Sequence, residues 1–151
     1  MFDHEEIKLL KEILAELVLI RVILEPKLTY IQIAFTKEGT MATQGPVVLN
    51  QGQSTTATVL YFDQTGAPMP STFVPPAVVY TIDHPEFASS TPGTDGQSDV
   101  IAYVAAGVAN LTATVQGPNG PLTDTETVTC NPVVAPPPVL SSIKIAFSTP
   151  A

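Results

Sequence analysis

The sequence lacks tryptophan and is poor in charged residues, and basic residues are almost absent from its middle. Lys and Arg together number 6 against 14 Asp and Glu, and neither Lys nor Arg occurs between Lys37 and Lys144. A protein that binds nucleic acid or an anionic membrane surface needs clustered cations to meet the phosphates. The charge distribution therefore argues against both as partners.

Cysteine pairing and membrane insertion are excluded on similar grounds. Cys130 stands alone in the 151 residues, so no disulfide can form within the chain and the fold must rest on packing. The apolar run 17–24 is too short to cross a bilayer, and Arg21 interrupts it. The N-terminus opens with acidic residues and offers no cleavage site, unlike a secretory signal. We therefore expect no membrane insertion, no signal peptide and assembly in the cytoplasm.

The first segment carries a complete set of helix signals. Asp3 and Glu6 have the spacing of a capping box, and Pro26 ends the pattern, because the residue before a proline disfavours helical geometry. We predict a helix from His4 to Leu24 within an N-terminal segment 1–25. Its apolar side chains recur at alternating spacings of three and four, a coiled-coil seam. The predicted oligomerisation residues of this seam are Leu10, Ile13, Leu17, Ile20 and Leu24.

Further apolar residues widen this surface toward the end of the helix, so that a solitary helix would be insoluble. Two arrangements can cover it: packing on the chain's own β-domain, or packing on copies of itself. The second is favoured, because a sandwich normally closes its core without a helix. Leu at the first seam position with Ile at the second favours three or more strands over two. The expected partner is thus a homo-oligomer, trimeric or larger.

The middle of the chain, 28–132, predicts an all-β domain. In the stretch Leu28–Thr36, Ile31, Ile33 and Phe35 alternate with residues of the opposite face, as in a half-buried strand. Ala109, Leu111, Ala113 and Val115 alternate in the same way and are predicted to face the core. Further strands are predicted at 47–49, 54–63, 77–83, 99–105, 108–116 and 123–130, with a hairpin between 99–105 and 108–116 and a loop at 89–98.

The pattern of the first strand recurs near the end of the chain. Residues 140–148 repeat it in register after a proline-rich linker at 133–139, and Ile143, Ile145 and Phe147 take the places of its core residues. Three interpretations stay open for 140–151. The segment begins a second repeat, pairs with a free edge of its own sheet, or adds to the edge of a neighbouring subunit as a complementing strand. The linker favours addition to a neighbouring subunit, and Ile143, Ile145 and Phe147 are the residues predicted to take part in that strand pairing.

Three stretches resemble the bacterial Ig-like (BIG) domains of surface adhesins and phage structural proteins. They are residues 51–53, which lead into a Thr-rich strand, residues 79–85, where the family usually has a tryptophan-containing strand, and above all residues 103–115, which look like a hallmark hairpin of that family. The resemblance covers 28–132, although the family's usual tryptophan is absent. It implies an Ig-like β-sandwich that serves as a spacer or binding module, without catalysis.

No arrangement of side chains indicates an enzyme or a cofactor. His4 and His84 lack an acid at a motif spacing, so they are interpreted as surface histidines. Asp95 and Asp99, with Asp83 and Glu86 upstream, offer oxygen ligands that calcium prefers, but not the alternating spacing of a calcium loop. A polar surface loop is the favoured interpretation, and neither a catalytic nor a metal site is predicted. Cys130 is predicted to be a small core residue.

Taken together, the patterns predict a mainly β protein, an Ig-like β-sandwich preceded by an oligomerising α-helix. The expected function is structural, in a virion (head fibre, decoration or tail protein) or an extracellular filament, with other subunits of that assembly as partners. The expected localisation is therefore the virion or the extracellular surface. The alternative is an adhesive module whose loops, around 65–76 and 89–98, bind a glycan or a cell surface.

Overall fold

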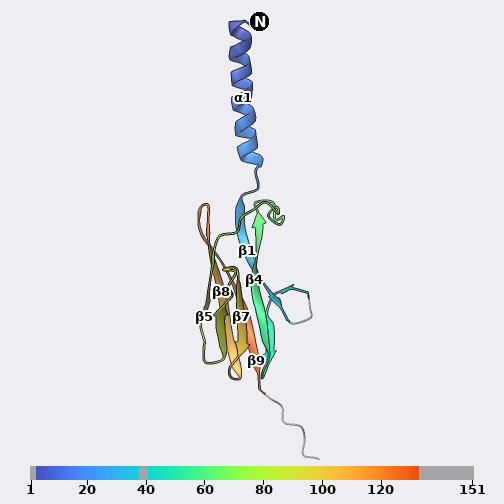
Figure 1. Cartoon of the computed structure of the whole chain (residues 1–151), viewed down its shortest axis with the longest axis vertical. Coiled ribbons are helices and arrows are strands. Elements are labelled where there is room, and N and C mark those ends of the chain that lie inside the picture. Colours follow the sequence, from blue (N-terminus) through green and yellow to red (C-terminus); the bar gives the residue numbers. More distant parts are fainter. Residues whose placement is uncertain (1–2, 38–40, 133–151) are drawn as a thin grey trace, which may run out of the picture.

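The computed structural model describes residues 3–37 and 41–132, which form one helix and a two-layer β-sandwich (Figure 1). The helix α1 spans His4–Leu24. The strands are β1 (Leu28–Thr36), β2 (Thr43–Gln44), β3 (Val47–Asn50), β4 (Ser54–Asp63), β5 (Val78–Ile82), β6 (Ala88–Pro92), β7 (Ser98–Tyr103), β8 (Gly107–Gly117) and β9 (Gly120–Asn131). The predicted strand at 140–148 lies outside the described residues.

Helix α1 begins and ends where its sequence predicts. The Asp3 carboxylate accepts a hydrogen bond from the Glu6 amide at 2.8 Å, and the Glu6 carboxylate accepts one from the Asp3 amide at 2.9 Å, which completes the capping box. None of its residues is buried, and it projects from one end of the sandwich along the long axis of the molecule (Figure 1). The helix therefore packs on neither sheet of its own chain.

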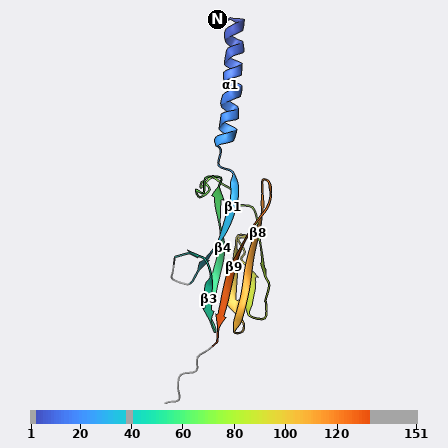
Figure 2. The same cartoon turned by 180° about the vertical axis from the view of Figure 1, so that it is seen from behind.

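The strands form a five-stranded sheet, ordered β2-β1-β4-β7-β6, and a four-stranded sheet, ordered β3-β9-β8-β5. Neighbouring strands are antiparallel except β3, which runs parallel to β9 (Figure 2). The predicted strand at 47–49 therefore exists as β3, and its partner β9 lies too far along the chain for a local pattern to reveal it. Strand β5 forms an edge, in agreement with the prolines that precede it.

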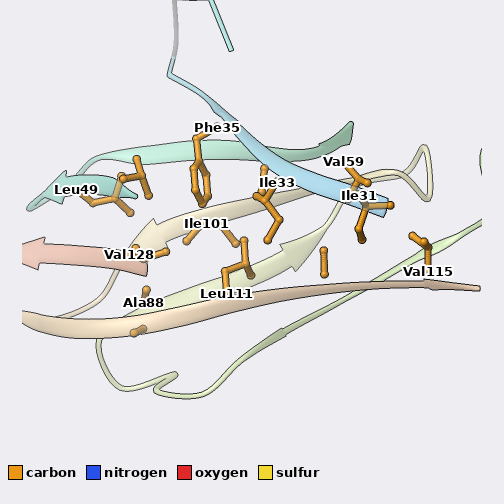
Figure 3. Packing of buried hydrophobic residues seen from close by; sticks show 14 of the residues in the cluster. Ile31, Ile33, Phe35, Leu49, Val59, Ala88, Ile101, Leu111, Val115 and Val128 are labelled. Carbon is orange, nitrogen blue, oxygen red and sulfur yellow. The ribbon is translucent and has the colours of Figure 1, made fainter. Parts of the chain in front are cut away.

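The core lies between the two sheets (Figure 3). Ile31, Ile33 and Phe35 of β1 are buried, as predicted, and they meet Leu111 and Val128 of the opposite sheet within one apolar cluster. Ala109, Ala113, Val115 and Cys130 are buried as well, which confirms their predicted places. The alternation of apolar and polar residues thus identified the inner face of both long strands.

The predicted hairpin between 99–105 and 108–116 is wrong. Strand β7 pairs with β4 and β6, whereas β8 pairs with β5 and β9 in the other sheet. The short connection passes between the layers: the amides of Val104 and Ala105 donate to the carbonyl of Phe87 at 2.9 and 3.1 Å. A Cβ on Gly107 would meet the Phe87 ring at 2.4 Å, so only glycine fits there. The true hairpin joins β8 to β9.

The predicted loop 89–98 is also partly wrong, because its first residues form β6 at an edge of the five-stranded sheet. The polar sequence of β6 carries no apolar alternation, and only Ala88 of this strand is buried. Its strand geometry is imposed by pairing with β7, where Ser90 lies opposite Ile101. A loop remains only at 93–97.

Candidate assembly surface on the N-terminal helix

The five seam residues predicted on α1 are all solvent-exposed in the single chain. Between 46% and 72% of each side chain's surface is open to water. They follow one another along one side of the helix, because the alternating spacing of three and four tracks its turn. The structure brings the predicted oligomerisation residues onto one continuous surface, and no part of the described chain covers it.

The second half of α1 is apolar on every side. After Glu16 the helix contains one charged residue, Arg21, whose Nε donates to Glu25 Oε1 at 3.2 Å. Val18, Leu19 and Val22 lie outside the seam and are also exposed. A helix that is apolar all round is usually buried on more than one side. The second half of α1 thus exposes apolar side chains beyond those of the seam.

A single side chain fixes the connection between α1 and the sandwich. The Gln64 amide accepts a hydrogen bond from the Lys27 amide at 2.7 Å and donates one to the Glu25 carbonyl at 3.3 Å. It thereby clamps the chain on both sides of Pro26, which has no amide hydrogen of its own. Sequence reasoning missed Gln64, because its partners lie 37 and 39 positions away.

The turn that carries Gln64 is itself held by Asp63. One oxygen of the Asp63 carboxylate accepts hydrogen bonds from the Thr65 hydroxyl at 2.7 Å and from the amides of Thr65 and Ala67 at 2.8 and 3.0 Å. These bonds, that of the Thr65 hydroxyl first, lower the pKa of Asp63. Beside this turn the rings of Tyr30 and Phe62 stack 4.8 Å apart. The base of the helix is thus a rigid corner of the sandwich.

Acid should therefore destabilise the sandwich. Hydrogen bonds to backbone or side-chain donors lower the pKa of Asp63, Asp83 and Asp95 in the folded state. Their stabilisation is complete above the ordinary aspartate pKa of about 3.9 and is lost as the pH falls through the lowered folded values. We expect the urea midpoint to fall between pH 6 and pH 2.5. Glu86 adds to this trend, because its bond to His84 lowers its pKa, whereas Glu126 opposes it, because burial raises its pKa.

The variant Asp63→Asn tests the origin of that acid sensitivity. It should lower the urea midpoint at pH 6 and shrink the difference between pH 6 and pH 2.5. Glu12→Gln, on the exposed helix, serves as the control and should change neither value. An acid shift of the same size in Asp63→Asn and the unmodified chain would show that this carboxylate does not contribute.

Of the segments predicted to bind a ligand, 65–76 lies at the helix end of the sandwich, and the remaining loop 93–97 meets it at Pro76. Gln97 joins them: its Oε1 accepts from the Tyr61 hydroxyl at 2.7 Å, and its Nε2 donates to the Pro76 carbonyl at 2.9 Å. Next to them lies an apolar hollow of about 540 Å³ whose lining includes Met69, Phe73 and Val74. Val74 is 84% exposed. The opposite end carries the turns at 51–53, 83–87 and 104–106.

The carboxylates considered as calcium ligands are engaged separately. Asp83 accepts from the amide and side chain of Asn110, and Glu86 bonds His84 at 2.9 Å. Asp95 accepts from the amides of Gln97 and Ser98, whereas Asp99 is buried, where the Ser90 hydroxyl donates to it. Within residues 3–37 and 41–132 no three such groups come together as metal ligands would. The four carboxylates stabilise turns and strand ends through these hydrogen bonds.

The remaining predictions concern Cys130, the repeated strand near the end of the chain and membrane insertion. Cys130 is a free thiol in the core, and burial raises its pKa, which disfavours the reactive thiolate. Ile143, Ile145 and Phe147 lie outside the described residues. In the part of the chain that the structure describes, no helix has the length and apolarity needed to span a bilayer.

Comparison with known proteins gives a structural neighbour but no family. No family model matches the chain, and neither does any curated protein. Among solved structures, domains 4 and 5 of the S-layer protein SbsC match with a TM-score of 0.51 and 21% identity over 71% of this chain. The chain spans about half, 54%, of that structure. At this identity the likeness shows the fold alone, a β-sandwich.

Proposed function

We propose that the chain is a non-enzymatic structural protein that assembles through α1 and displays its sandwich on a surface. The assembly is a virion, with this chain as a head fibre, decoration or tail component, or an extracellular filament. The observation that carries the proposal is the exposed seam of α1. A soluble helix with this much apolar surface is stable in water only when a partner covers it.

The energy of covering the seam is large enough for association. Each seam side chain that goes from about half exposed to buried contributes on the order of 1 kcal/mol. Five such residues per helix contribute about 10 kcal/mol for two helices and about 15 kcal/mol for three, which is comparable with the estimated 4–15 kcal/mol that each association step costs in lost freedom of motion. The number of helices is indicated by the Leu and Ile order of the seam, which favours three or more strands.

An Ig-like identity of the sandwich is supported by its strand order. In such domains the first, second, fourth and fifth strands form one sheet, and the third, sixth and seventh form the other. Counting β1 with β3 as two halves of the first strand, β1-β4-β7-β6 and β9-β8-β5 follow that plan. Ig-like domains act widely as spacers and display modules on surfaces. The solved neighbour is part of an S-layer protein, which supports an extracellular structural role for this chain.

Removing the helix tests this function. No residue of α1 is buried, so a chain that starts at residue 26 keeps the whole core of the sandwich. We expect the full chain to run as a trimer or larger in light scattering and the shortened chain to run as a monomer with unchanged β-sheet circular dichroism. An equal number of subunits in both would refute assembly through α1.

A second candidate function is adhesion, and the apolar hollow beside Phe73 and Val74 favours it. Such a hollow, with polar groups such as Gln116 and Lys27 at its wall, has the mixed character of a small-ligand site. Its position next to α1 weighs against it, because an assembled stalk would crowd this end. Binding of the chain that starts at residue 26, but not of the full assembly, on a glycan array would fit a site that the stalk covers.

A further inference from the structure

The residues that flank the seam distinguish the two ways in which copies of α1 can meet. On one flank lie Ile7, Leu14 and Arg21, and on the other lie Leu9, Glu16 and Ile23. Four of the six are apolar, whereas Glu16 and Arg21 carry opposite charges on opposite flanks, five positions apart. That spacing is the one that joins neighbouring helices of a parallel bundle.

In a parallel bundle in register, each residue of the second flank faces the residue five positions further along the first flank of its neighbour. Leu9 then meets Leu14, and Glu16 meets Arg21. In an antiparallel bundle each flank faces its own kind, so Glu16 meets Glu16 when the helices overlap fully and Leu9 or Ile23 in a shifted register, while Arg21 meets an apolar residue. Only the parallel arrangement matches apolar with apolar and acid with base at both places.

We propose that copies of α1 pack in parallel and in register, with Glu16 of each copy paired with Arg21 of the next. This inference rests on the proposed assembly through α1 and adds its orientation, its register and the residues that specify both. It places every sandwich at the same end of the bundle. Glu16 and Arg21 act here as specificity-determining residues, because surface ion pairs set partner orientation more than they add affinity.

The geometry of the single chain leaves both residues ready for this pairing. The Arg21 side chain is 81% exposed and uses Nε for Glu25, while the guanidinium has further N–H donors to offer a second carboxylate. Glu16 takes part in no ion pair within the described residues. Arg21 can therefore bridge Glu25 of its own helix and Glu16 of the neighbour.

Charge reversal tests the pair. Glu16→Arg places two arginines together at every helix contact, and we expect the dissociation constant of the full chain to rise at least about tenfold, since like charges in contact repel. Glu12→Arg makes the same charge change on the side of the helix away from the seam, and it should change the dissociation constant by less than about threefold. The double variant Glu16→Arg with Arg21→Glu restores opposite charges and should recover most of the affinity. Equal weakening by Glu16→Arg and Glu12→Arg would overturn the pair.

A cross-link tests orientation independently. Leu10→Cys puts a thiol on the seam near one end of α1, where parallel copies in register bring the same residue together at disulfide distance. Under a glutathione redox buffer we expect linked dimers of Leu10→Cys and none of the unmodified chain, whose Cys130 is buried. If removal of residues 1–25 dissociates the oligomer but Leu10→Cys forms no linked dimers, the parallel arrangement is wrong and the proposed function still stands. If removal of residues 1–25 does not dissociate the oligomer, both the parallel arrangement and the proposed function are wrong.

Discussion

The variant Leu17→Asp should convert the assembled protein into monomers. Leu17 lies at the centre of the seam and is 56% exposed in the single chain, and the proposed assembly would bury it in every copy. The substitution loses about 1 kcal/mol of burial per copy and forces like charges together in the seam. We expect the dissociation constant to rise by a factor on the order of 1,000 or more, measured by analytical ultracentrifugation, with the sandwich's thermal midpoint unchanged.

Leu19→Asp is the matched control, because Leu19 is 61% exposed but lies outside the seam. It should change association far less than Leu17→Asp. Equal dissociation in both variants would mean that apolar surface alone drives assembly, without a defined seam. Unchanged mass in both would show that α1 is not the contact.

Leu111→Ala should destabilise the sandwich itself. Leu111 is 0% exposed in β8 and belongs to the cluster that joins the two sheets (Figure 3). Truncating a buried leucine leaves a cavity and typically costs about 2–5 kcal/mol of unfolding free energy. Urea denaturation followed by tyrosine fluorescence measures this loss in the chain that starts at residue 26, where assembly adds nothing.

Leu60→Ala in β4 gives the comparison at a surface position, since 36% of Leu60 is exposed. Its cost should stay at or below about 1 kcal/mol. A loss for Leu111→Ala no greater than that for Leu60→Ala would contradict the assignment of Leu111 to a closely packed core.

The parts of the fold that the sequence predicts are those decided by neighbouring residues. Asp3, Glu6 and Pro26 fix the ends of α1 locally, and alternation along β1 and β8 identifies their inner faces. The same local rules predict β4 with its observed bounds. Each of these features depends on side chains within a few positions of one another.

The parts that it does not predict depend on distant partners. The sequence of a three-residue connection does not show whether it closes a hairpin or crosses between sheets. Here the Phe87 carbonyl accepts hydrogen bonds from the amides of Val104 and Ala105, and the connection crosses to the other sheet. Strand β6 has no pattern of its own, because pairing with β7 makes it a strand. Gln64 and Gln97 act through partners more than 15 positions away, so nothing near them in sequence reveals their roles.

The seam of α1 lies between these two cases. Its spacing is visible in the sequence, and the structure adds that the sandwich leaves it open. Orientation and register emerge only when the flanks are placed around the helix, where Glu16 and Arg21 fall on opposite sides of Leu17 and Ile20.

The two ends of the described chain leave the sandwich at opposite poles, α1 at one and residue 132 at the other (Figure 1). Tension applied between them runs along β1 and β9. Strand β1 is held to β4 along its length, β9 is held to β8 and to the parallel β3, and Asp124 of β9 accepts the Ile33 amide of β1 at 2.6 Å. Pulling therefore shears these ladders as a whole instead of peeling them bond by bond. We therefore expect the sandwich to resist force along its long axis better than force that peels the sheets apart.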